Sequence, residues 1–206
     1  MFTGIVEETG VIKKKILNLD GMELTIHANK VLEDLKVNDS ISCSGICLTV
    51  TKLFEKGFVV QLVEETIDRT TAKFWDVNSR INLERSLLPT TRLGGHFVQG
   101  HVDTITEIKN IKKNEASAVW DFTLTSDIKN YVVEKGSISL DGISLTIAKK
   151  FEDHFSVALI PHTLDITTWK EKKIGDLINV EADMMAKYIE NFIGNKKWNL
   201  VLLILL

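Results

Sequence analysis

The stretch Ser139–Ile147, "SLDGISLTI", repeats an earlier phrase of the same chain, "SCSGICLTV" at Ser42–Val50. When the sequence is compared with itself at a shift of 97 positions, residues Ser40–Glu84 align with Ser137–Glu181, and 21 of the 45 aligned positions are identical. A match of this length is far beyond chance. A period near 97 residues is too long for a solenoid unit and predicts a duplicated domain.

The repeat extends upstream, where "GIVEETGVI" from Gly4 matches "GHVDTITEI" from Gly100 at a shift of 96. Within each copy, alternating and β-branched segments such as Ser137–Ile147 and Phe155–Ile160 predict antiparallel strands. A small sheet with this many strands protects its edges most simply by closing into a barrel. One helix is expected to interrupt each copy, and these helices are predicted at Lys30–Lys36 and Ser126–Gly136.

A further helix is predicted after the second copy, at Asp183–Trp198. Its apolar residues recur at helical spacing and form one stripe. The stripe either packs back on its own barrel or covers a second copy of the chain, and we favour self-association. The apolar end, "WNLVLLILL" at Trp198–Leu206, is far shorter than the ~20 residues of a membrane-spanning helix and is interpreted as buried or interfacial. The stripe consists of Met185, Tyr188, Ile189, Phe192 and Ile193.

The composition indicates an ordinary soluble protein. Hydrophobic residues make up 44% of the 206 residues, charged residues 26%, and the net charge is -3, so no basic field exists to attract nucleic acid. The two cysteines, Cys43 and Cys47, lie in one short segment and favour a reducing compartment. The amino terminus does not resemble a secretory signal, and we expect a cytoplasmic protein that is not membrane-bound.

Polar residues within the repeats are the candidates for chemistry. Strand alternation places Ser144 and Thr146 on one face, and Cys47 and Thr49 share the equivalent face of the first copy. Small hydroxyl or thiol groups beside glycine would let a flat polar ring approach the backbone, although satisfied core positions remain the alternative. His101 stands where the first copy has Ile5, as expected for chemical specialisation of one site.

Two other kinds of site are not predicted. The cysteines together with His96 and His101 match no standard zinc spacing, so no metal is expected. The chain also contains no glycine loop of the kind that cradles nucleotide phosphates.

Several motifs together resemble the riboflavin synthases of the lumazine-binding family. They are "MFTGIVEETG", "GGHFVQGHVD", the pair "SGICLTV" and "DGISLTI", and "LIPHTLDITT", and the resemblance runs from Met1 to about Ile193. It implies an all-β fold: two similar six-stranded antiparallel Greek-key barrels in tandem, plus a C-terminal α-helix that assembles a homotrimer. The implied domains are residues 1–96, 97–182 and 183–206, the last comprising the helix and the apolar tail.

The resemblance also implies the reaction. Two molecules of 6,7-dimethyl-8-ribityllumazine dismutate by transfer of a four-carbon unit, giving riboflavin and 5-amino-6-ribitylaminouracil without a cofactor. Each barrel would hold one lumazine, with a donor and an acceptor meeting across a subunit boundary. Association with lumazine synthase, which makes the substrate, is raised by the same resemblance. The alternative is a non-catalytic lumazine-binding fluorescent protein.

The family pattern implies two sets of lining residues. The amino-terminal set is Gly4, Ile5, Val6, Cys47, Leu48, Thr49, Gln61, Leu62, Val63, Glu64, Glu65, Thr66, Gly100, His101 and Val102. The carboxy-terminal set is Lys135, Ser144, Leu145, Thr146, Leu159, Ile160, Pro161, His162, Thr163 and Leu164.

Catalytic roles are predicted for five of the family-implied positions. His101 is expected to move protons, Ser144 or Cys47 to assist at the ring carbon that is attacked, Thr146 to lie beside them, and Phe2 to pack on a ring. The chain departs from the family in two places. His162 stands where a carboxylate is common, which leaves its contact with the ribityl chain open, and the leucine-rich end replaces a polar tail.

Overall fold

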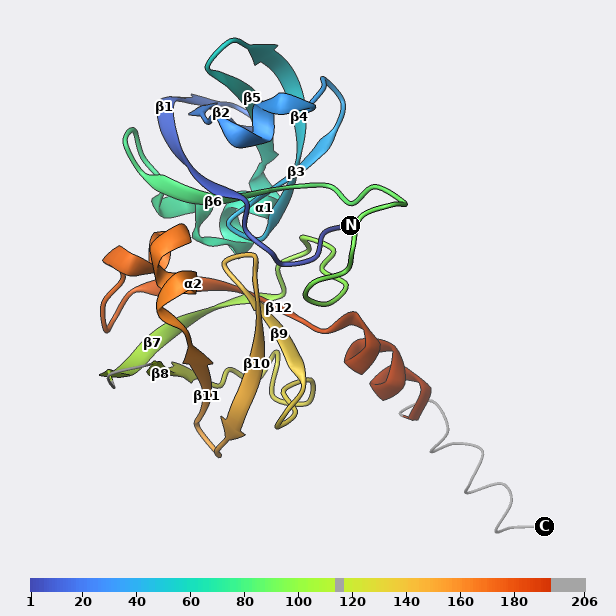
Figure 1. Ribbon diagram of the computed structural model, residues 1–206, viewed down its shortest axis with the longest axis vertical. Coiled ribbons are helices and arrows are strands. Elements are labelled where there is room, and N and C mark those ends of the chain that lie inside the picture. Colours follow the sequence, from blue (N-terminus) through green and yellow to red (C-terminus); the bar gives the residue numbers. More distant parts are fainter. Residues whose placement is uncertain (114–116, 194–206) are drawn as a thin grey trace, which may run out of the picture.

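Each sequence copy forms a closed six-stranded antiparallel barrel, as predicted, and the barrels lie one above the other in the computed structural model (Figure 1). The structure describes residues 1–113 and 117–193. The first barrel contains β1 (Glu8–Asn18), β2 (Gly21–His27), β3 (Ser40–Cys43), β4 (Ile46–Phe54), β5 (Gly57–Val63) and β6 (Arg80–Arg85). The second contains β7 (Thr104–Lys113), β8 (Ala118–Thr123), β9 (Ser137–Leu140), β10 (Ile143–Lys150), β11 (His154–Leu159) and β12 (Leu177–Ala182).

The two barrels share one topology. The strand order is β1-β2-β5-β4-β3-β6 in the first barrel, and the second repeats it with β7 to β12 in the corresponding places. Three consecutive hairpin-linked strands, β3, β4 and β5, lie beside β2, which is the Greek-key arrangement. The register shifts at equivalent places in both barrels, where β-bulges bend the long strands enough to close the sheet. These shifts fall between Ile12/Lys14, Val50/Lys52, Ile108/Asn110 and Ile147/Lys149.

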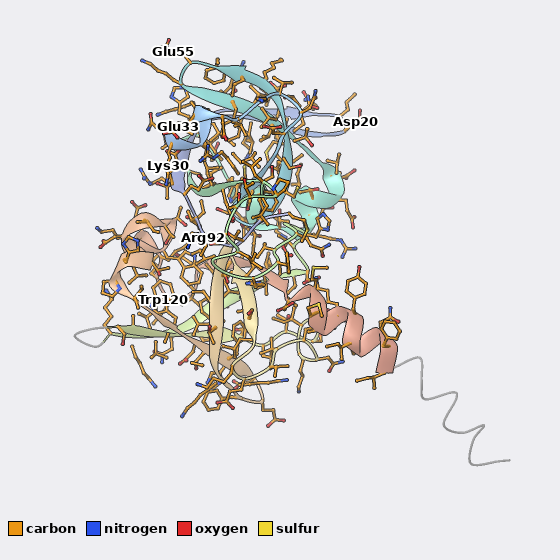
Figure 2. All side chains as sticks on the ribbon, turned by 45° about the vertical axis from the view of Figure 1, so that its right-hand side comes forward. Asp20, Lys30, Glu33, Glu55, Arg92 and Trp120 are labelled. Atoms are coloured by element: carbon orange, nitrogen blue, oxygen red, sulfur yellow. The ribbon has the colours of Figure 1, made fainter. Side chains whose placement is uncertain are left out.

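The two cores differ in content. In the second barrel, Trp120 (labelled in Figure 2) stacks on Trp169 with ring centroids 5.1 Å apart. Both side chains are almost fully buried. The first barrel has Leu24 and Ala72 at the corresponding positions. The barrels are therefore copies in backbone but not in packing.

The helices inside the copies differ from the prediction. Lys30–Lys36 contains only the short 3₁₀ helix η1 (Lys30–Glu33), and residues 126–131 of the second predicted helix form turns. The predicted apolar side chains are nevertheless buried, because Ile128 and Val132 pack into the second core. Burial of these β-branched residues decides the local conformation, since so short a helix has little intrinsic stability.

Two pairs of short helices occur where none was predicted. In the first barrel, α1 (Glu64–Arg69) leads into the 3₁₀ helix η2 (Thr71–Phe74); in the second, α2 (Pro161–Ile166) leads into η3 (Thr168–Glu171). Their sequences, "EETIDRTT" and "PHTLDITT", belong to the repeat. Thr70 and Thr167 cap the two 3₁₀ helices by accepting a hydrogen bond at the side-chain oxygen.

The predicted carboxy-terminal helix is present over residues 184–193, and it points away from the barrels (Figure 1). It is tied to the second barrel by an ion pair of 2.6 Å between Lys187 and Asp103 and by a hydrogen bond from Asn130 to Glu190. Its apolar stripe stays exposed, for example Phe192 at 71%. Within the described chain, Met185, Ile189 and Ile193 border a cavity of about 370 Å³ together with Tyr131 and Val133, but these three side chains of the stripe stay more than half exposed. The predicted extension to Trp198 and the leucine-rich tail lie outside the described residues.

A pair of asparagines joins the barrels. The buried Asn179 of β12 donates to the Ser44 carbonyl at 2.8 Å and accepts from the Thr71 amide at 2.7 Å, both in the first barrel. Asn82 of β6 makes the mirrored bonds to the second barrel. Each asparagine therefore satisfies backbone groups of the opposite barrel. The partners of Asn82 are Asp141 and Thr168.

The turns of the two repeated phrases touch at the centre of this interface. Gly45 and Gly142 have φ angles of +82° and +77°, and a side chain on Gly45 would meet the Gly142 nitrogen at 2.7 Å. Glycine is required here both by the left-handed backbone and by the close approach of the other copy.

Asn179→Ala is expected to lower the free energy of unfolding by about 2–4 kcal/mol, because it leaves the Ser44 carbonyl and the Thr71 amide buried without partners. Urea denaturation measures the change. The exposed Asn18→Ala serves as control and should stay within about 0.5 kcal/mol of the parent protein. Equal losses in the two variants would contradict the bridging role.

Candidate functional site

Two short backbone segments cross from one barrel to the other. We call Thr3–Ile5 the amino-terminal strap and Gln99–His101 the linker strap. The Gly4 carbonyl accepts a hydrogen bond from the Ser144 amide at 2.7 Å, and the Gly100 carbonyl accepts one from the Cys47 amide at 2.8 Å. Each strap therefore lies against one of the repeated phrases, beside the residue that differs between the copies.

Only glycine fits the centre of each strap. Gly4 and Gly100 have φ angles of +75° and +80°. A side chain on Gly4 would approach Ser144 Cβ to 2.5 Å, and one on Gly100 would approach Cys47 Cβ to 2.6 Å. The backbone itself therefore forms one wall over Ser144 and over Cys47.

The straps are exchanged between the barrels. Val6, which follows the amino-terminal strap, is buried in the core of the second barrel, and Val102, which follows the linker strap, packs on the core of the first. The predicted grouping of Gly4–Val6 with Cys47 is therefore wrong: these residues accompany Ser144. Gly100 lies against Cys47 and Val102 packs on the first core, so these residues adjoin the barrel with which they were grouped, and their contact with a ligand stays a prediction.

A buried carboxylate holds each strap. Glu84 of β6 accepts from the Thr3 amide and hydroxyl, both at 2.6 Å, and from the Gly4 amide at 3.0 Å. Burial raises the pKa of Glu84 to about 7, although the hydrogen bonds from Thr3 and Gly4 act to lower it and the nearby Glu7 raises it further.

Glu181 of β12 occupies the equivalent place in the second barrel. It accepts from the amides of Gln99, Gly100 and His101 at 2.6, 2.8 and 3.0 Å. Burial raises its pKa as well, opposed by these donors and by the charge of Lys187. The two carboxylates thus present oxygen acceptors to three donors each.

Ser144 has a histidine partner that the sequence analysis did not select. His96 Nδ1 lies 2.7 Å from Ser144 Oγ, and the His96 amide donates to the Thr3 carbonyl at 3.1 Å. Burial lowers the pKa of His96, so the neutral ring is favoured and a ring nitrogen is available to accept the hydroxyl proton. In the sequence, the motif "GGH" at Gly94–His96 marks this segment but does not point to Ser144.

Cys47 has different surroundings. Its side chain is half-buried, whereas Cys43 on the preceding strand is fully buried and burial raises the pKa of that thiol. His101, whose amide is held by Glu181, has an exposed side chain in the adjacent strap. The structure therefore places the His101 backbone near Cys47, whereas the His96 side chain contacts the Ser144 hydroxyl.

The other predicted lining residues lie on neighbouring elements of the same barrels. Thr49 and Thr146 are exposed on β4 and β10, so both hydroxyls are accessible. Lys135 has a φ of +66°, and its amide donates to the Ile147 carbonyl of β10 at 2.8 Å. The remainder cover the ends of β5 and β11 and the helices that follow, namely Gln61, Leu62 and Val63 of β5, Glu64, Glu65 and Thr66 of α1, Leu159 of β11, the adjoining Ile160, and Pro161, His162, Thr163 and Leu164 of α2.

Alternation divides these residues into two groups. Leu48, Leu62 and Leu159 are buried in the barrel cores, so they support the walls and offer no surface to a ligand. Val63 and Ile160, one position further on, are 61% and 58% exposed and present apolar surface at equivalent places in the two copies.

Phe2 belongs to the strap system. Its side chain has no exposed surface, and its backbone pairs with Val98 through hydrogen bonds of 2.7 and 3.1 Å. In this conformation, Phe2 joins the start of the chain to the linker and offers no face to a ligand.

A cavity of about 640 Å³ lies beside the amino-terminal strap. It contains Ile5 and Glu84, and its charged wall includes Arg85, which pairs with Glu7 and Asp34. Ile5 is the only predicted lining residue that borders it. The cavity is therefore distinct from the strand faces that carry Cys47 and Ser144.

Two features are absent from the described ranges, 1–113 and 117–193. No group of three or more His, Cys, Asp and Glu side chains there could hold a metal ion. None of the helices in the same ranges is both long and apolar enough to span a membrane.

Comparison with known proteins places these features in a family. The model of the lumazine binding domain matches residues 3–86 and again residues 99–183. Proteins named riboflavin synthase from Bacillus subtilis (strain 168) and Schizosaccharomyces pombe are 42% and 41% identical to the chain, covering 97% and 94% of it and 93% and 94% of their own lengths. The Brucella abortus riboflavin synthase is 43% identical over 91% of the chain and 96% of its own length.

Solved structures agree with the fold. LumP complexed with riboflavin superimposes with a TM-score of 0.81 at 25% identity, covering 88% of this chain and 99% of that one. LumP complexed with 6,7-dimethyl-8-(1'-D-ribityl) lumazine gives a TM-score of 0.79 at 23% identity, with the same coverage. The tandem barrels, each matched by the lumazine binding domain, are thus those of a lumazine-binding protein. The chain belongs to the riboflavin synthase family of lumazine-binding proteins, with one lumazine binding domain in each barrel.

Glu84 makes stability depend on pH with a defined sign. Because its pKa is raised from 4.5 to about 7, the folded protein keeps this proton to a higher pH than the unfolded chain does. Between these values the unfolded chain loses the proton first, so the contribution, fully present below pH 4.5, declines as pH rises to about 7.

We therefore expect the free energy of unfolding of the parent protein to fall, relative to that of Glu84→Gln, by up to about 3 kcal/mol over this range. Denaturant titrations of both proteins at several pH values measure the difference, in which the other titrating groups cancel. Parallel curves for the two proteins would contradict the assignment.

Proposed function

We propose that this chain is a riboflavin synthase, which converts two molecules of 6,7-dimethyl-8-ribityllumazine into riboflavin and 5-amino-6-ribitylaminouracil. One lumazine gives a four-carbon unit to the other. All atoms of the two substrates appear in the two products, so the reaction needs no oxidant, reductant or cofactor. Relatives at 41–43% identity over nearly the whole chain carry this name, which supports the proposal.

The observation that carries the proposal is the unequal pair of strap-covered strands. In the first barrel, the linker strap lies over Cys47; in the second, the amino-terminal strap lies over Ser144, which has His96 as partner. A protein that only stored a ligand would need one such site. Two similar but unequal sites suit a reaction in which two identical molecules take different roles, and holding them in fixed orientation can supply much of the barrier lowering.

The proposed chemistry is proton transfer with nucleophilic assistance. The ring methyl of lumazine becomes acidic when the ring carries the resulting charge, so a modest base suffices. His101 moves protons at the site of the first barrel. Ser144, whose hydroxyl can pass its proton to neutral His96, or Cys47 assists at the ring carbon that is attacked. The exposed Thr146 and Thr49 supply hydroxyls to the ring edge.

We propose that the remaining lining residues orient the substrates. Exposed Val63 and Ile160 contact the flat ring in the two barrels, and the polar groups of the following helices bind the ribityl chain. The functional units are then the predicted domains 1–96 and 97–182, each holding one lumazine, with the helix of 183–206 serving assembly.

We further propose a homotrimer located in the cytoplasm, with lumazine synthase as a partner. The support for assembly is the apolar stripe, in which Met185, Tyr188 and Ile189 are each more than half exposed. Water contact along so continuous a stripe is costly, and a second copy of the chain would remove it.

The reaction itself is tested by mixing the purified protein with 6,7-dimethyl-8-ribityllumazine without metal or cofactor and following both absorbances. We expect two lumazines to be consumed for each riboflavin formed. A boiled sample serves as control. Tight binding with stable lumazine fluorescence and no product would instead assign the chain to non-catalytic ligand binding.

His101→Ala and Ser144→Ala are each expected to lower kcat about 100-fold, because each removes a group placed for proton transfer or nucleophilic assistance. Steady-state kinetics measures the loss. His27→Ala is the matched control, since His27 lies on β2 against Phe54, outside the proposed sites, and should keep parental kcat. If both test variants kept parental turnover, positioning alone would account for catalysis.

A further inference from the structure

Glu84 and Glu181 contact neither Ser144 nor Cys47 through any hydrogen bond in the described structure, yet each is connected to one of them through a strap. Glu84 lies on β6 of the first barrel, and in the strap that it holds, the Gly4 carbonyl accepts a hydrogen bond from the Ser144 amide of the second. Glu181 lies on β12 of the second barrel, and its strap reaches Cys47 of the first. The connection is crosswise in both directions.

The peptide groups of the two glycines carry this connection. In Gly4 and in Gly100, the amide binds a carboxylate of one barrel while the carbonyl binds a strand amide of the other. The two peptide planes meet at the glycine Cα, and the two bonds together hold the glycine in its left-handed conformation between the barrels, so the carboxylate helps to determine where the strap lies over the reactive strand. Both carboxylates are buried, at 5% and 3% exposure, where hydrogen bonds are less weakened by water.

The two connections differ at the residue after glycine. The His101 amide donates directly to Glu181 at 3.0 Å. The Ile5 amide instead donates to the Thr3 hydroxyl at 3.1 Å, and that hydroxyl donates to Glu84. The direct bond therefore belongs to the strap that carries the proposed proton-transfer histidine.

We propose that Glu84 and Glu181 are positioning residues that act across the barrel boundary: Glu84 sets the strap over Ser144, and Glu181 sets the strap over Cys47 together with His101. The inference deepens the proposed function and rests on it for the meaning of the two sites. Loss of the Glu84 carboxylate therefore displaces the strap over Ser144 and leaves the strap over Cys47 in place. Loss of the Glu181 carboxylate has the opposite effect.

Thiol reactivity tests this without turnover. Cys47 is half-buried under the linker strap, whereas fully buried Cys43 reacts only when the first barrel unfolds. The full-length protein is treated with iodoacetamide under native conditions, and peptide mass spectrometry follows each cysteine separately. In Glu181→Gln, an NH₂ group replaces one oxygen and faces a backbone donor, so we expect Cys47 to be alkylated about tenfold faster. Glu84→Gln should leave the Cys47 rate within about twofold of the parent.

A second parent protein, with its thiol moved to the other barrel, measures the position of the amino-terminal strap. In a protein carrying Cys47→Ser and Ser144→Cys, the new thiol lies under the amino-terminal strap. Here Glu84→Gln is expected to accelerate alkylation about tenfold, and Glu181→Gln to leave it within about twofold. This reversal distinguishes crosswise positioning from general loosening, which would accelerate both reporters in both variants.

The proposal is overturned if each variant exposes the thiol of its own barrel, if both thiols respond equally, or if neither responds. Should Cys43 react together with Cys47, the barrel has unfolded, and Glu84→Asp and Glu181→Asp replace the glutamine variants, with the same crossed pattern expected at smaller size. Because alkylation needs no substrate, a protein that formed no riboflavin could still show the crossed pattern, and an active enzyme could lack it.

Discussion

The peptide groups of Gly4 and Gly100 are the points on which the arrangement of the two sites depends. Each binds a buried carboxylate of one barrel and a strand amide of the other, and each has a left-handed φ that glycine alone adopts without strain. Neither β4 nor β10 is covered by a segment of its own barrel alone, because the strap over it is held by a glutamate of the other.

The same exchange gives the duplicated protein its asymmetry. Cys47 and Ser144 make equivalent backbone bonds to the straps, with amide to carbonyl distances of 2.8 and 2.7 Å. What differs is the chemistry placed on this common frame, namely a thiol beside exposed His101 in one case and a hydroxyl bonded to buried His96 in the other. Duplication thus supplies the geometry twice, and a few substitutions make the two sites unequal.

Most of the architecture was predictable from sequence, and the failures have local causes. The repeat predicted two barrels, and the closed strand order confirms them. The helix predicted at Ser126–Gly136 was wrong because Ile128 and Val132 obtain their burial within turns. The helices α1 and α2 were missed because six-residue helices carry too little periodicity to detect. His96 was passed over because nothing in its spacing connects it to Ser144, 48 residues away.

The sequence by itself determined the duplication, the β class, the polar residues on the repeated strands and the asymmetry between Cys47 and Ser144, because these follow from internal identity and strand alternation. Only the tertiary structure decided which strap covers which strand. Which strap covers which strand depends on how the two closed barrels pack against each other. A strap that precedes one barrel in the sequence is long enough to reach either barrel, so its position in the sequence does not decide the pairing. The bonds of the Gly4 and Gly100 carbonyls to the Ser144 and Cys47 amides define the exchanged arrangement, and they join residues far apart in the sequence.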